Sequence, residues 1–236
     1  MRKVVLKDYE EMCKYASNIV EQQIKSNPKS VLGLPTGSTP IGMYRDLIRK
    51  NLDFSGVTTF NLDEYYGLPK SNDQSYDYFM RSMFFNYINI DKNNINIPNG
   101  EAPDAAEECA RYDAAIIAAG GIDLQVLGVG VNGHIGFNEP AAALSPNTNL
   151  VQLTQSTIEV NSRFFDKAED VPKTAITMGM GNILQAKKII ILVNGKSKTD
   201  ILKRTFSEGV TTQNPSSFLL LHPDVTYIVD EEANGA

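Results

Sequence analysis

Short apolar runs alternate with helical patterns along the whole 236-residue chain, and this alternation limits the possible folds more than any other feature. The runs lie at residues 30–34, 57–61, 124–129, 189–193 and 225–229. Nearly continuous apolar runs of this length are typical of strands that are buried on both faces of a parallel sheet. The pattern therefore predicts an α/β fold with an open, mainly parallel sheet and helices on both faces.

Helical spacing of apolar residues predicts the elements between these runs, at residues 8–24, 40–48, 75–87, 103–119 and 197–207. Asp8 and Glu11 form a capping box at the start of the first helix. Thr39 followed by Pro40 predicts an N-cap and a first helical residue for the second. The chain has no internal repeat, low-complexity tract or linker, so we expect one domain over residues 1–236.

Composition narrows the classes of partner. A formal net charge of −6 disfavours a surface for nucleic acid or acidic membrane, although one cleft can still be locally positive and bind a small anion. No stretch is apolar enough for a signal peptide or a membrane span, so we expect a cytoplasmic protein. Cys13 and Cys109 lie far apart in predicted helices without a Cys/His cluster, which indicates packed thiols rather than a metal site or a disulfide.

Four distinctive segments, all predicted to be loops, each follow a predicted strand, at residues 35–39, 63–64, 130–134 and 195–198. In open parallel sheets, ligands bind just beyond the carboxyl ends of the strands. We therefore expect these segments to meet at one edge of the sheet and to form one site.

Two of these segments carry groups suited to an anion. Thr36-Gly37-Ser38-Thr39 joins a strand to a helix N-terminus, where N–H groups and hydroxyls can bind phosphate; it lacks the ending of a Walker A loop and can also be a simple capped turn. Arg163 and Lys198 are candidate phosphate contacts, with Lys196 as a competitor for Lys198. All three cations can equally be surface residues.

The other two segments carry acid–base groups. Asp63 and Glu64 can bind Mg²⁺, act as a general base or remain solvated. His134 lies in a glycine-rich turn rather than in an apolar segment, which favours proton transfer over core packing, and Glu139 is near enough in sequence to orient the imidazole. His222, which leads into the last strand, is interpreted as structural.

At these residues the chain resembles the glucosamine-6-phosphate deaminase family over nearly its whole length. The similar segments lie at residues 32–40, 60–65, 128–140, 161–165, 171–173 and 219–223, and the most specific is the Gly-His-Ile-x-Phe-Asn-Glu-Pro string that contains His134. The resemblance implies a fold shared with ribose-5-phosphate isomerase and CoA transferases. It also implies conversion of glucosamine 6-phosphate and water to fructose 6-phosphate and ammonia.

The resemblance also implies a role for each matching residue. His134 would open the sugar ring with support from Asn132 and Glu139, and Asp63 would move the proton from C2 to C1. The phosphate would be held by Thr36, Gly37, Ser38, Thr39, Arg163 and Lys198. The resemblance implies a small sugar-phosphate substrate, no metal and no organic cofactor, and we expect a monomer or a small homo-oligomer.

The chain departs from the family pattern in two ways. Many members carry Asp where this chain has Asn132, and an amide supplies no charge to the imidazole, so Glu139 is expected to be its charged partner. Residues 141–152 contain no Lys or Arg, whereas allosteric members bind an effector phosphate with a basic loop there and have a longer C-terminal region. The chain therefore resembles the short, unregulated form.

Two other functions are compatible with such a chain. A 6-phosphogluconolactonase shares the fold and handles a sugar phosphate, but it needs no enolising base of the kind that Asp63 offers. A sugar-phosphate-binding effector domain of a transcriptional regulator needs no acid–base residues, whereas Asp63, His134 and Glu139 are all present.

Overall fold

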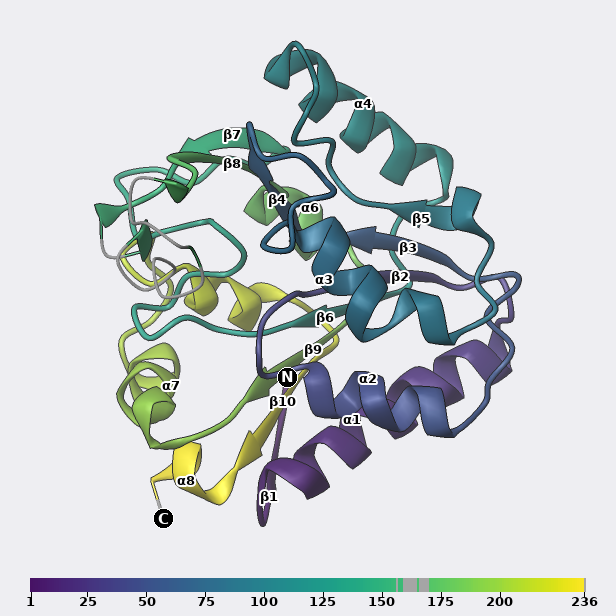
Figure 1. Ribbon diagram of the computed structural model, residues 1–236. Helices are drawn as coiled ribbons and strands as arrows, with labels where there is room; N and C mark the ends of the chain where they lie inside the picture. The colour runs from purple at the N-terminus through teal and green to yellow at the C-terminus, as the bar shows by residue number, and fades with distance from the viewer. Residues whose placement is uncertain (156, 159–164, 166–169, 236) are drawn as a thin grey trace.

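The central sheet has seven strands in the order β1-β10-β9-β6-β2-β3-β5, and every pairing is parallel (Figure 1). The computed structural model describes residues 1–155, 157–158, 165 and 170–235. The strands are β1 (Arg2–Leu6), β2 (Val31–Leu34), β3 (Thr58–Asn61), β5 (Ile95–Asn96), β6 (Leu124–Leu127), β9 (Lys188–Val193) and β10 (Val225–Asp230). The predicted open parallel sheet is confirmed, and β1 and β5 are strands that the apolar runs did not indicate.

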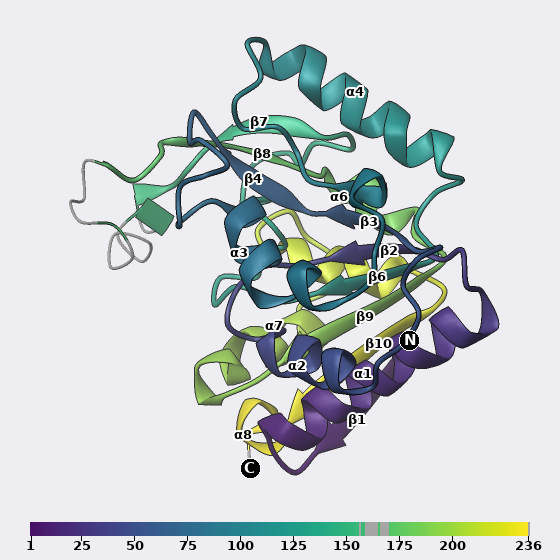
Figure 2. The same cartoon turned by 45° about the vertical axis from the view of Figure 1, so that its right-hand side comes forward.

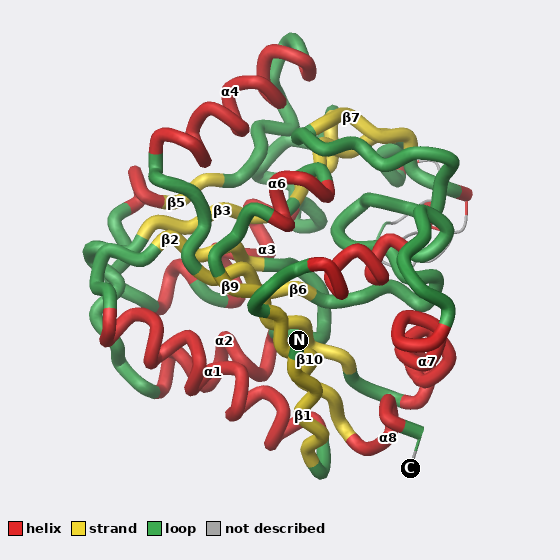
Figure 3. The backbone as a smooth tube through the Cα atoms, turned by 180° about the vertical axis from the view of Figure 1, so that it is seen from behind, coloured by secondary structure: helices red, strands yellow, loops and turns green. Residues whose placement is uncertain are grey.

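Helices cover both faces of this sheet, as predicted (Figures 2 and 3). One face packs against α1 (Tyr9–Ser26), α2 (Ile41–Arg49) and α3 (Tyr76–Met83), and the other packs against α4 (Ala105–Ala118), α6 (Met180–Leu184) and α7 (Thr199–Ser207). The first core contains Met12, Tyr44 and Phe84, and the second contains Tyr112 and Tyr227, all fully or almost fully buried. A short helix, α8 (Glu231–Asn234), follows the last strand.

A second, antiparallel sheet has the order β4-β8-β7 and consists of β4 (Asp63–Tyr66), β8 (Thr174–Thr177) and β7 (Asn149–Gln152). Asp63 and Glu64 therefore begin a strand, and their prediction as a loop is wrong. Only Leu62 separates β3 from β4, so the chain leaves the parallel sheet within one residue and pairs with a strand that is distant in sequence. Such pairing carries no local sequence signal.

The helix ends follow the predictions in part. Asp8 caps α1 by accepting a hydrogen bond from the Glu11 N–H at 2.9 Å. The predicted cap at Thr39 is wrong: α2 begins at Ile41, after Pro40, and the Thr39 hydroxyl instead donates to Asn194 Oδ1 at 2.8 Å. The two cysteines are buried and free, as predicted. Within the described ranges, no helix has the length and apolarity that crossing a bilayer requires.

Candidate active site

A cavity of about 420 Å³ lies at the carboxyl ends of β2, β3 and β6. Thr36, Asp63, His134 and Lys198 all line it, so the predicted convergence of the four segments is confirmed. Its volume falls within the usual range for small-molecule sites. Arg163, the remaining predicted cation, lies outside the described residues.

The loop after β2 presents donors to one wall of this cavity. Gly37 has a φ of +103°, a left-handed conformation that favours glycine, and it turns the chain toward the N-terminus of α2. The Tyr9 hydroxyl fixes the loop from α1, because it lies 3.0 Å from the Thr39 carbonyl oxygen and accepts the Gly42 N–H at 2.9 Å. The Thr36 and Ser38 hydroxyls and the helix N-terminus are thereby placed to receive an anion.

Lys198 supplies the positive charge on the facing wall. It ends η4 (Lys196–Lys198), a single 3-10 turn after β9, and burial lowers the pKa of its ammonium. Asp230 anchors this turn, because both of its carboxylate oxygens lie 3.0 Å from the Gly195 N–H. Lys196 is exposed and does not line the cavity, so Lys198 is the lysine that faces the site.

Asp63 is the buried acid of the cavity, with 6% of its surface exposed. Burial raises the pKa of its carboxyl from 3.8 to about 8, and the neighbouring charge of Glu64 adds to this effect. Among the described residues, none donates a hydrogen bond to its carboxylate. A Cβ at Gly136 would lie 3.0 Å from Asp63 Oδ2, so the missing side chain there leaves room for this group. Such an acid can act as a base near neutral pH.

Glu64 has a different role from its neighbour. Its Oε1 accepts the N–H groups of Tyr65 at 2.8 Å and Tyr76 at 2.9 Å, and its Oε2 accepts the Asp77 N–H at 2.8 Å. Burial outweighs these hydrogen bonds and raises the pKa of Glu64 to about 7. Of the alternatives open for this acid, the structure places it in a buried contact that ties β4 to the start of α3. No group of three or more metal-binding His, Cys, Asp or Glu side chains occurs in the described part of the chain.

His134 is held by a tight glycine-rich turn after β6. The Gly130 N–H donates to the His134 carbonyl at 2.9 Å, and the His134 N–H donates to Asn132 Oδ1 at 3.1 Å. The imidazole packs directly on Gly130, where a Cβ would lie only 2.2 Å from the ring atom Cε1. The turn therefore requires glycine at this position so that the ring can face the cavity.

Glu139 lies behind the imidazole, with its Oε1 3.4 Å from His134 Nδ1. The Thr157 hydroxyl donates to Oε1 at 2.7 Å, and Asn132 Nδ2 donates to Oε2 at 2.6 Å. Burial raises the pKa of this carboxyl, but His134, Thr157 and Asn132 together outweigh burial and lower the pKa to about 2. Glu139 is therefore a permanent anion beside the imidazole at neutral pH.

The Asn132 amide forms hydrogen bonds with both Glu139 and the histidine turn. Its Nδ2 donates to Glu139 while its Oδ1 accepts the backbone N–H of His134. An ionised Asp has no donor for the first of these bonds. The amide thus links the acid to the histidine turn without placing two negative charges in contact.

Some residues of the cavity were not predicted. Tyr76 and Phe137 line it and stack on each other, with ring centroids 6.0 Å apart and planes 7° apart, and Thr157 lies beside Glu139. The aromatic-rich stretch around Tyr76 was visible in the sequence, but nothing local connects it to the strand ends. His222 is buried, with Nε2 2.7 Å from the Ala186 carbonyl oxygen, as expected for a structural residue.

The family follows from a comparison with known proteins. Residues 8–227 match the family model described as glucosamine-6-phosphate isomerases/6-phosphogluconolactonase. The chain belongs to this family. Among the family's curated members, the glucosamine-6-phosphate deaminase of Thermoanaerobacter pseudethanolicus is 55% identical over 99% of this chain and 94% of that protein.

Solved structures give the same family relationship. A structure described as a monomeric glucosamine-6-phosphate deaminase superposes with a TM-score of 0.96 at 42% identity, covering 99% of each chain. The 6-phosphogluconolactonase of Thermotoga maritima superposes with a TM-score of 0.77 over 98% of this chain and 99% of that one, but at only 19% identity. The similarity to the lactonase shows a common fold and does not indicate which reaction this chain catalyses.

Proposed function

We propose that this family member converts glucosamine 6-phosphate and water to fructose 6-phosphate and ammonia. The observation that carries the proposal is the position of Asp63, a buried acid with a raised pKa that lines the same cavity as His134. The relatives with 55% and 42% identity are named as deaminases of this substrate. A lactonase would not need an enolising base such as Asp63, and an effector domain would need neither Asp63 nor His134 for catalysis.

The phosphate binds between the loop after β2 and the turn after β9 in this proposal. Lys198 supplies charge, and Thr36, Gly37 and Ser38 supply hydroxyl and N–H donors, with Arg163 as a further cation. Thr39 contributes through its backbone, because its hydroxyl is already bonded to Asn194. Binding the phosphate positions the reacting end of the sugar.

His134 opens the ring by moving the anomeric hydroxyl proton to the ring oxygen, which leaves the open-chain aldehyde. Glu139 stabilises the imidazolium that forms during this transfer. Asn132 holds Glu139 in place relative to the histidine turn by hydrogen bonds to both. The Glu139 carboxylate stays ionised throughout because of its low pKa.

Asp63 then removes the proton from C2 and returns it to C1, while a second proton passes from the C2 nitrogen to the C1 oxygen, so that the C1 aldehyde becomes an alcohol and the C2 amine becomes an imine. Water adds to this imine, and the carbon–nitrogen bond breaks with release of ammonia and formation of the ketone. The raised pKa of Asp63 matches this role, because a base is most efficient when its pKa lies near the working pH.

We further propose a single cytoplasmic domain over residues 1–236 that functions as a monomer or a small homo-oligomer. A charged sugar phosphate does not cross membranes unaided, so its enzyme is expected in the same compartment as the substrate. The solved relative with 42% identity is described as monomeric.

The decisive experiment is an assay of ammonia release by the purified protein, with N-acetylglucosamine 6-phosphate as the control compound. We expect turnover of glucosamine 6-phosphate alone, because the acetylated nitrogen cannot form the imine that water attacks. Absence of ammonia with both compounds would reject the proposal.

A further inference from the structure

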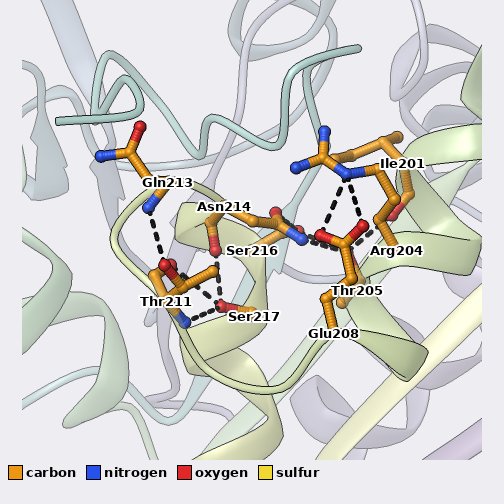
Figure 4. Close-up of polar contacts among 9 residues, drawn as sticks. All are labelled: Ile201, Arg204, Thr205, Glu208, Thr211, Gln213, Asn214, Ser216 and Ser217. Carbon is orange, nitrogen blue, oxygen red and sulfur yellow. Dashed lines mark hydrogen bonds and ion pairs between the residues drawn. The ribbon is translucent and has the colours of Figure 1, made fainter.

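A buried polar network lies beneath the histidine turn and is formed by Thr205, Asn214 and Ser216 (Figure 4). Thr205 is on α7, and Ser216 is in η5 (Pro215–Leu221). The Ser216 hydroxyl donates to Asn214 Oδ1 at 2.7 Å, Asn214 Nδ2 donates to Thr205 Oγ1 at 3.2 Å, and the two hydroxyls of Thr205 and Ser216 are 2.7 Å apart. All three residues are at most 2% exposed.

The network contacts the turn at Gly133. The Ser216 N–H donates to the Gly133 carbonyl at 2.8 Å. Gly133 has a φ of +92°, and a Cβ there would lie 2.1 Å from Asn214 Oδ1. The backbone immediately before His134 therefore lies against the Asn214 amide, and a shift of that amide toward Gly133 would displace the turn.

His134 has few other restraints. Among the described residues, its ring has one charged neighbour, Glu139 at 3.4 Å, and it packs on Gly130. The position of the imidazole in the cavity is therefore determined mainly by the backbone of residues 130–134. The directional hydrogen bond to Gly133 comes from the Ser216 backbone N–H, and the side-chain hydrogen bonds among Ser216, Asn214 and Thr205 fix the position of that backbone.

The network also connects this turn to the phosphate side of the cavity. α7 begins directly after Lys198, and Thr205 lies near its other end, where the Thr205 hydroxyl donates to the Ile201 carbonyl at 2.8 Å. The helix that starts at the cationic residue thus also supports the histidine.

We infer that Thr205, Asn214 and Ser216 are positioning residues for His134, an inference that rests on the proposed role of this histidine. They touch no substrate and act by fixing the turn through Gly133. The result is a defined distance between the imidazole and the sugar ring.

Thr205→Val tests this directly, because it keeps the shape of the side chain and removes the hydroxyl that accepts from Asn214 Nδ2, lies beside the Ser216 hydroxyl and donates to the Ile201 carbonyl. We expect kcat to fall on the order of 10–100-fold, as for small misplacements of a reacting group, with KM nearly unchanged. Thr205→Ser keeps the hydroxyl and should restore most of kcat. Ser30→Ala, which removes another fully buried hydroxyl at the opposite end of β2, is the matched control for loss of stability alone.

Nuclear magnetic resonance gives a second measurement that is independent of turnover. The chain has only two histidines, so the imidazole C2–H region contains two signals, which a His222→Gln variant assigns. At fixed pH, Thr205→Val should shift or broaden the His134 signal and leave that of His222 in place. Ser216→Ala tests the same point if Thr205→Val does not give folded protein.

The outcomes separate the two proposals. A wild-type protein that releases no ammonia contradicts the proposed function, while the resonance experiment still tests the positioning. An unchanged His134 signal and kcat in Thr205→Val would overturn the inference. Equal losses in Thr205→Val, Thr205→Ser and Ser30→Ala would also overturn it, since they would show a general effect on stability.

Discussion

The two sheets contribute different chemistry to one cavity. The parallel sheet supplies the groups suited to an anion, Thr36, Ser38 and Lys198, and also His134, all from exposed or half-buried positions in loops beyond its strands. The antiparallel sheet supplies Asp63, the first residue of β4, which is buried and has a raised pKa. A binding group can remain hydrated until the ligand arrives, whereas a carboxylate that acts as a base near neutral pH needs burial to raise its pKa. The chain provides a buried site for Asp63 by leaving the parallel sheet directly after β3.

Asp63→Asn should show the largest effect and test the role assigned to the small sheet. The substitution keeps shape and polarity but removes the base, so we expect kcat to fall by roughly 10²–10⁴-fold with substrate binding largely intact. Steady-state assays of ammonia release and calorimetric titration with glucosamine 6-phosphate measure the two quantities. Near-normal turnover would remove Asp63 from the mechanism.

Lys198→Ala tests the role assigned to the parallel sheet. Loss of a charge-assisted contact to phosphate should weaken binding by roughly 1.5–3 kcal/mol, about 10–150-fold in affinity. Lys196→Ala, an exposed lysine in the same turn, is the control and should bind normally. Equal weakening toward unphosphorylated glucosamine would show that Lys198 does not contact the phosphate.

Glu64→Gln separates the two neighbouring acids of β4. An amide cannot accept all three N–H groups that the carboxylate accepts, so we expect a loss of about 1–3 kcal/mol in the free energy of unfolding. Removing the charge also lowers the pKa of Asp63, so the acid limb of the rate profile should move to lower pH. A loss of turnover as large as that of Asp63→Asn would instead place Glu64 in the reaction.

The pH dependence of stability tests the burial of Asp63 without any substrate. Between about pH 4 and pH 8 the folded protein holds a proton on Asp63 that the unfolded chain has released, so rising pH lowers the stability of the wild type. Asp63→Asn lacks this dependence. The free energy of unfolding of Asp63→Asn, relative to that of the wild type, should therefore increase with pH by up to about 1.4 kcal/mol per pH unit and level off above pH 8. Parallel curves for the two proteins would contradict a raised pKa.

The same contrast explains what the sequence could predict. Buried parallel strands are continuous apolar runs, and the loops after them follow a geometric rule, so the convergence of Thr36, His134 and Lys198 was predictable. Asp63 was recognised as a candidate, but its strand was not, because β4 pairs with β8 across a large separation in sequence. The contacts of Thr205 and Asn214 beneath Gly133 depend in the same way on tertiary packing and had no visible signal.

α7 begins directly after Lys198 and carries Thr205 near its end, where Thr205 accepts a hydrogen bond from Asn214, the residue that lies against Gly133. If Lys198 holds the phosphate and His134 opens the ring, as proposed, α7 links the two groups and helps to set the distance between them. We then expect that a sugar phosphate one carbon shorter, anchored by its phosphate, does not reach His134 and Asp63 at the same time. We expect such compounds to bind as inhibitors rather than react, so chain length would be selected without any residue that contacts the missing carbon.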